Sequence, residues 1–136
     1  MRHHQVFVYG TLMKGESNHH YLRNARFLGK AATAPQYRLY SLGAYPVLCD
    51  AGKQRIHGEV YRISQVALQR LDELEEYPQY YQRKLIATPW GRAWIYYQRQ
   101  PRGRARLISS GDWRDEQGRI LQRFNGCLVD GWDRRE

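Results

Sequence analysis

Short apolar runs separated by glycine, proline or polar residues dominate the chain and predict β-strands. The predicted strands are residues 5–9, 25–34, 37–40, 47–49, 55–63, 81–88, 92–97 and 107–108. The polar segment 13–23 predicts a loop with one helical turn beginning at Asn18. Many short strands with one main helix favour an α+β fold, in which a small, strongly curved or closed sheet packs against that helix.

The main helix is predicted over residues 65–76. Ser64 is a favourable N-cap, and Pro78 ends the helix because proline lacks the N–H that would continue it. The apolar residues of the segment form one stripe, Ala67, Leu68, Leu71 and Leu74. Glu75 falls within this stripe, so the helix directs one carboxylate toward the core.

Burial and the negative end of the helix dipole both disfavour the ionised form of Glu75, so we expect its pKa to be raised. A carboxyl group with a raised pKa suits general acid/base catalysis. Two structural alternatives stay open. Glu75 forms a buried ion pair, for example with Arg83, or the helix rotates and exposes Glu75.

The first predicted strand ends abruptly at Gly10. Backbone N–H groups that follow the strand lose their partners there, and glycine has no Cβ to hinder the approach of a ligand. A cluster of free amides is a natural site for a carboxylate or phosphate. The turn after residue 9 is therefore a candidate anion site, and an ordinary strand-ending turn is the structural alternative.

Composition adds a strong basic excess: 22 lysines and arginines against 13 acidic residues give a formal net charge of +9 in 136 residues. Several arginines cluster in one predicted loop, namely Arg99, Arg102, Arg104 and Arg106. Nucleic-acid binding through this loop is one candidate function, and a solvated basic loop and tail is the simpler interpretation.

Other classes of site find little support. No apolar run is long enough to span a bilayer, and no apolar signal region precedes the first strand, so we expect no membrane association. The two cysteines do not resemble a disulfide framework, which favours a reducing cytoplasm. The neighbouring histidines, at 3–4 and 19–20, are poorly spaced to bind one metal ion, so no metal site is predicted.

Five segments together resemble the γ-glutamylcyclotransferase-like (AIG2-like) family, particularly its small bacterial branch. The segments are FVYGTLMKG (residues 7–15), YSLGAYP (40–46), GEVY (58–61), LDELEEYP (71–78, with Tyr81 and Arg83) and SGDW (110–113). The resemblance implies a small mixed β-barrel with flanking short helices over residues 1–113, followed by a charged C-terminal extension, 114–136. The family often has a glycine where this chain has Glu76, which leaves Glu76 as the alternative to Glu75; helical phase favours Glu75.

The resemblance also implies an activity. Tyr9, Gly10, Thr11 and Leu12 would hold the α-amino acid end of a γ-glutamyl group, Tyr81 would position the substrate, and Glu75 would be the acid/base. The substrate's own amine would attack its γ-amide carbonyl, giving 5-oxoproline and a free amine or amino acid without a cofactor. A binding module with the same fold, recognising a small γ-glutamyl-like ligand or a partner, is the alternative from another functional class.

Overall fold

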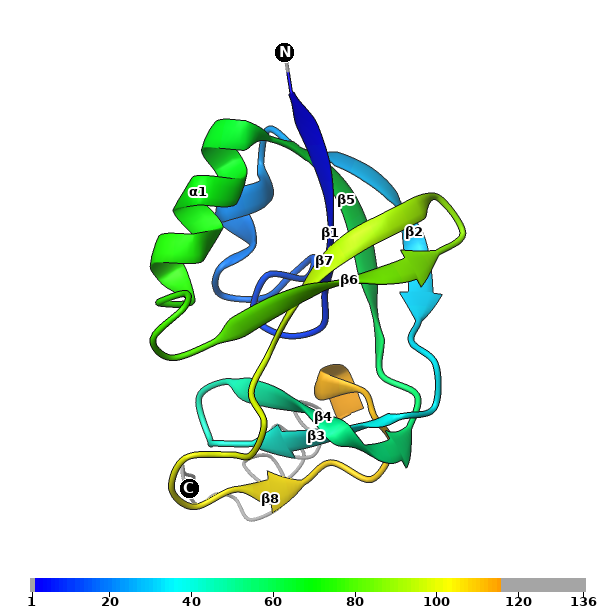
Figure 1. Ribbon diagram of the computed structural model, residues 1–136, viewed down its shortest axis with the longest axis vertical. Helices are drawn as coiled ribbons and strands as arrows, with labels where there is room; N and C mark the ends of the chain where they lie inside the picture. Colours follow the sequence, from blue (N-terminus) through cyan, green and yellow to red (C-terminus); the bar gives the residue numbers. More distant parts are fainter. Residues whose placement is uncertain (1, 116–136) are drawn as a thin grey trace.

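The computed structural model describes residues 2–115, which include two β-sheets, the helix α1 and the 3-10 helix η1 (Figure 1). The larger sheet has the strand order β2-β5-β1-β7-β6. Its strands are β1 (His3–Val8), β2 (Arg26–Ala32), β5 (His57–Ser64), β6 (Gln82–Thr88) and β7 (Gly91–Tyr97). The smaller sheet has the order β4-β3-β8, formed by β3 (Tyr37–Ser41), β4 (Pro46–Gln54) and β8 (Arg106–Leu107).

The α+β class is confirmed, but the expectation of a barrel is wrong, because the larger sheet does not close. β2 and β6 are its two free edges. The register of the parallel pairing of β1 with β7 is limited to the pair Val6 and Trp94. The tip of the β6–β7 hairpin reaches β2 through a side chain: the Trp90 ring lies so close to Gly29 that a Cβ there would overlap it.

The predicted helix is confirmed as α1 (Gln65–Leu74), and Figure 1 shows it lying alongside the larger sheet. Ser64 caps it, since its hydroxyl accepts a hydrogen bond from the Ala67 N–H at 3.1 Å. Leu68 and Leu71 are fully buried, as the apolar stripe predicts. The stripe therefore faces the core, and α1 does not rotate to expose it.

A Schellman motif ends α1. The N–H of Glu76 donates to the carbonyl of Glu73 at 3.1 Å, and the N–H of Tyr77 donates to that of Asp72 at 2.9 Å. Glu76 has a φ of 51°, in the left-handed region that favours glycine. Glu75 is the last residue before this reversal, so the backbone on both sides of it is fixed.

Most other predicted elements are confirmed with shifted ends. The helical turn expected after Asn18 is the 3-10 helix η1 (His19–Leu22). β4 continues well past its predicted end, because its second half is a half-exposed polar segment without a clear apolar pattern. Gly58 on β5 lies against the backbone of Val8, where a Cβ would overlap the carbonyl oxygen.

Two further sequence-based expectations concern membrane spans and the C-terminal extension. Within residues 2–115, no helix has the length and apolar character needed to cross a membrane. Most of the expected C-terminal extension, residues 116–136, lies outside the described part of the chain. Arg114, which we assigned to that extension, contacts the body of the domain through Glu59.

Candidate active site

A cavity of about 400 Å³ opens where the end of α1 approaches the turn that follows β1. Its walls also include the start of β4 and part of β7. The lining residues are 7–12, 17–18, 44–46, 74–76, 80–81 and 96. All six predicted site residues are among them: Tyr9, Gly10, Thr11, Leu12, Glu75 and Tyr81. The fold therefore brings together residues that are up to 72 positions apart in the sequence (81 − 9).

The turn after β1 presents three backbone N–H groups, those of Gly10, Thr11 and Leu12, that have no acceptor among residues 2–115. Gly10 is required sterically, because a Cβ at this position would lie 2.5 Å from Cγ of Pro46. The predicted loss of ladder partners after Tyr9 is thus confirmed. Free amides that face a cavity are suited to binding a carboxylate or a developing oxyanion.

Asn18 holds this turn in place from the far end of the loop. Its backbone N–H donates to the Thr11 carbonyl at 2.8 Å, and its side-chain amide donates to the Thr11 hydroxyl at 3.0 Å. The sequence suggested Asn18 as a helix cap, but its side chain makes no capping hydrogen bond to η1. The residue instead fixes the turn, which keeps the free N–H groups oriented before any ligand arrives.

The Glu75 carboxylate lies at the end of α1 and is only partly exposed. It forms no hydrogen bond or ion pair with another described residue. The ion pair that we considered between Glu75 and Arg83 is not formed, because Arg83 binds Asp72 instead, with Nε–Oδ1 and Nη2–Oδ2 distances of 2.9 and 3.2 Å. Glu75 is therefore left with an unpaired carboxylate facing the cavity.

Burial raises the pKa of Glu75 to about 7. The cause is desolvation, since removing the carboxylate from water penalises its charged form. A carboxyl group that is half ionised near neutral pH can accept a proton and return it in the same reaction cycle. The structure thus supports the raised pKa of Glu75 expected from the sequence, with burial as its cause.

Two tyrosines form rigid walls beside Glu75. The Tyr9 hydroxyl donates to the Tyr96 carbonyl at 2.8 Å, and the Tyr81 hydroxyl donates to the Pro46 carbonyl at 3.0 Å. Burial, and secondarily nearby charged or ionisable groups, raises the pKa of both tyrosines well above the ordinary value. Both hydroxyls therefore stay protonated, and their protons are already committed to backbone carbonyls.

Glu59 holds the loop that follows β1 through hydrogen bonds, a role that the sequence analysis missed. Its side chain is 2% exposed; Oε1 accepts hydrogen bonds from the Lys14 N–H at 3.0 Å and the Tyr61 hydroxyl at 2.9 Å. Oε2 accepts from Nη2 of Arg114 at 2.6 Å, and the same Nη2 donates to the Lys14 carbonyl at 3.1 Å. The available signal was a carboxylate between Gly58 and Val60 in a predicted strand, since burial of such a group requires partners.

Comparison with known proteins places this geometry in context. Residues 6–115 match the family model described as gamma-glutamyl cyclotransferase, AIG2-like. A provisionally named gamma-glutamylcyclotransferase of Vibrio cholerae is 52% identical over 110 residues, covering 81% of this chain and 95% of the relative. The Escherichia coli K12 protein named gamma-glutamylcyclotransferase family protein YtfP is 44% identical over 111 residues, covering 82% and 96%.

The fold is also similar to solved structures. The crystal structure of an uncharacterized protein from Pyrococcus horikoshii superposes with a TM-score of 0.76 at 31% identity, covering 88% of this chain and 97% of that chain. The similarity thus extends over nearly the whole of that protein and over most of this chain.

Proposed function

The chain belongs to the gamma-glutamyl cyclotransferase, AIG2-like family, and from this premise we propose that it cyclises a small γ-glutamyl compound to 5-oxoproline and releases the attached amine. The observation that carries the proposal is the unpaired Glu75 carboxylate, whose pKa is raised to about 7, in the same cavity as the free N–H groups of residues 10–12. This arrangement supplies a proton acceptor and an anion site on either side of a small substrate.

In the proposed reaction, the free N–H groups of Gly10, Thr11 and Leu12 bind the substrate's α-carboxylate or the oxyanion that develops on the γ-carbonyl. Glu75 takes a proton from the α-ammonium group. The freed amine attacks the γ-carbonyl carbon, and a C–N bond forms that closes the five-membered ring. The bond to the leaving nitrogen then breaks as Glu75 returns the proton to it. The ring nitrogen gives up its second proton to the released amine, which leaves as an ammonium ion.

Nucleophile and electrophile belong to the same molecule, so the main task of the protein is to hold the substrate in a folded conformation. The walls formed by Tyr9 and Tyr81 suit this task, since their hydroxyls are fixed by backbone carbonyls. Because the reaction is an intramolecular acyl transfer, it requires no cofactor.

The charge of the cavity bears on the leaving group. The described residues that line it include two glutamates, Glu75 and Glu76, and no lysine, arginine or histidine. A leaving amino acid would bring a carboxylate near these acidic groups without a cationic partner. We therefore propose γ-glutamyl amines, whose leaving group lacks a carboxylate, as better substrates than γ-glutamyl amino acids.

The test measures 5-oxoproline release from matched γ-glutamyl amines and γ-glutamyl dipeptides by wild type, Glu75→Gln and the neighbouring control Glu76→Gln. We expect Glu75→Gln to lose at least about 100-fold in kcat. The control should keep activity within a few fold. Full turnover by Glu75→Gln would overturn the mechanism, and ligand binding without release by wild type would instead favour a binding module.

A further inference from the structure

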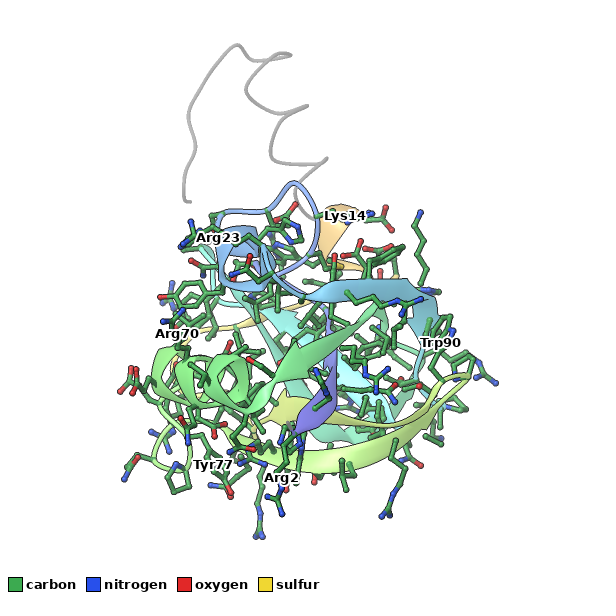
Figure 2. The ribbon with its side chains drawn as sticks, turned by 90° about the horizontal axis from the view of Figure 1, so that it is seen from above. Arg2, Lys14, Arg23, Arg70, Tyr77 and Trp90 are labelled. Atoms are coloured by element: carbon green, nitrogen blue, oxygen red, sulfur yellow. The ribbon has the colours of Figure 1, made fainter. Side chains whose placement is uncertain are left out.

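A second cavity, of about 660 Å³, lies at the end of the larger sheet where β1 begins. We call it the basin; it is lined by residues 3–5, 26, 28, 62, 85, 90, 92 and 94. None of these residues lines the candidate active site. Figure 2 looks onto this end of the molecule and shows Trp90 at the outer edge, at the tip of the β6–β7 hairpin beside β2.

The basin carries concentrated positive charge. Arg26, Arg62 and Arg92 line it, and none of their guanidinium groups has an ion-pair or hydrogen-bond partner among residues 2–115. Arg26 and Arg62 are directly opposite each other in the pairing of β2 with β5. Like charges at such positions repel, and the described lining contains no acidic residue to offset them. An anion bound between the guanidinium groups would relieve this repulsion.

Gln5 contributes an unpaired polar atom to the same cavity. It faces Arg62 in the pairing of β1 with β5. Its Nε2 donates to the Trp90 carbonyl at 2.7 Å, which fixes the orientation of the amide. Its Oε1 is buried and has no hydrogen-bond donor. Buried acceptors are normally paired, so this oxygen is suited to an N–H or O–H group from a ligand.

Two tryptophans complete the basin. Trp94 carries the Arg83 guanidinium over one side of its ring, with 4.2 Å between the guanidinium carbon and the ring centroid. The Trp90 ring packs against the backbone at Gly29, and the residue as a whole stays 37% exposed. Indole rings that are held in place beside arginines are favourable stacking surfaces for planar heterocycles.

From these features we propose that the basin binds a nucleotide unit. Its phosphate would lie between Arg26, Arg62 and Arg92, and its base would stack on a tryptophan ring and donate to Oε1 of Gln5. The bound nucleotide unit is either a free nucleotide or one nucleotide of a single-stranded nucleic acid. This site is distinct from the basic loop at residues 99–106, and the proposal does not depend on the cyclotransferase activity.

The experiment titrates the full chain with a mononucleotide, inorganic phosphate and a short single-stranded oligonucleotide, with intrinsic tryptophan fluorescence and calorimetry as readouts. The basin variant is Arg26→Gln/Arg62→Gln. The matched control is Arg99→Gln/Arg104→Gln, which removes the same charge from the exposed basic loop. Thermal unfolding of both variants checks that they fold.

We expect wild type to bind the mononucleotide more tightly than phosphate, with a change in tryptophan fluorescence. The basin variant should bind at least about tenfold more weakly, and the control should be unchanged within a few fold. Tighter binding of the oligonucleotide would identify nucleic acid as the source, and equal affinity per nucleotide would identify the free compound. Absence of nucleotide binding by wild type, affinity no better than for phosphate, or equal weakening in both variants would overturn the proposal.

Discussion

Arg83 binds both carboxylate oxygens of Asp72, which lies in the last turn of α1. Asp72 also accepts a hydrogen bond from the Tyr96 hydroxyl at 2.6 Å. Arg83 and Tyr96 thus satisfy the Asp72 carboxylate. Because Arg83 is bound to Asp72, its charge does not neutralise Glu75. The helix therefore carries two inward carboxylates with different environments, and the unpaired one faces the cavity.

The pH dependence of activity should report the pKa of Glu75. Because the ionised carboxylate accepts the first proton, we expect kcat/KM to rise about tenfold per pH unit on the acid side and to level off near pH 7. A rate profile for wild type between pH 5 and 9 would check this. An acid limb centred near the ordinary carboxyl value would contradict it.

The same raised pKa of Glu75 predicts a stability effect of definite sign. The folded protein holds this proton up to about pH 7, whereas the unfolded chain releases it near 4.5. Wild type should therefore lose about 1–3 kcal/mol of unfolding free energy, relative to Glu75→Gln, as the pH rises through this window. Denaturant unfolding of both proteins at pH 4.5 and 8 measures the difference. A constant difference across the window would be inconsistent with a buried carboxyl.

Glu76→Gly should stabilise the protein and preserve turnover. Glu76 has a φ of 51°, which glycine adopts without strain, so the gain should be about 0.5–1 kcal/mol. Thermal unfolding and 5-oxoproline release check the two parts separately. A large loss of activity with an intact fold would assign the acid/base role to Glu76.

Arg114→Leu should destabilise the loop of the anion site. It leaves the 2% exposed Glu59 carboxylate without its cation, at a cost of about 2–4 kcal/mol. Because Glu59 also binds the Lys14 N–H, we expect KM to rise as well. Adding Glu59→Gln should recover part of the stability. If the losses of stability caused by Arg114→Leu and Glu59→Gln simply add in the double variant, Arg114 and Glu59 are not coupled.

Gly10→Ala should impair the site through Pro46. The new Cβ would lie 2.5 Å from Cγ and 2.9 Å from Cδ of Pro46, so the turn must shift. We expect the free energy of unfolding to fall by about 1–3 kcal/mol. We expect activity to fall by a larger proportion than stability, because the shifted turn carries the anion site. Pro46→Ala removes both ring atoms, and the double variant should regain much of the loss. Unchanged activity in Gly10→Ala would show that the turn's position is not critical.

Local features of this fold were predictable from the sequence. The stripe of α1, the Ser64 cap and the inward position of Glu75 follow from helical periodicity within one segment. The pairing of Glu59 with Arg114 was not predictable, because it joins residues 55 positions apart. The open sheet was missed for a similar reason: the contact of Trp90 with Gly29 substitutes for strand pairing, and strand composition does not reveal which edges stay free.

β1 supplies residues to both cavities. Its first half, His3 to Gln5, lines the basin, while Phe7 and Val8 at its other end line the candidate active site. Its side chains are matched residue by residue to β5. Deletion of one residue would exchange the two faces of the strand and displace both cavities together. The length of this segment is therefore a constraint on sequence divergence, whereas insertions are more readily accommodated in the exposed turn between β7 and β8.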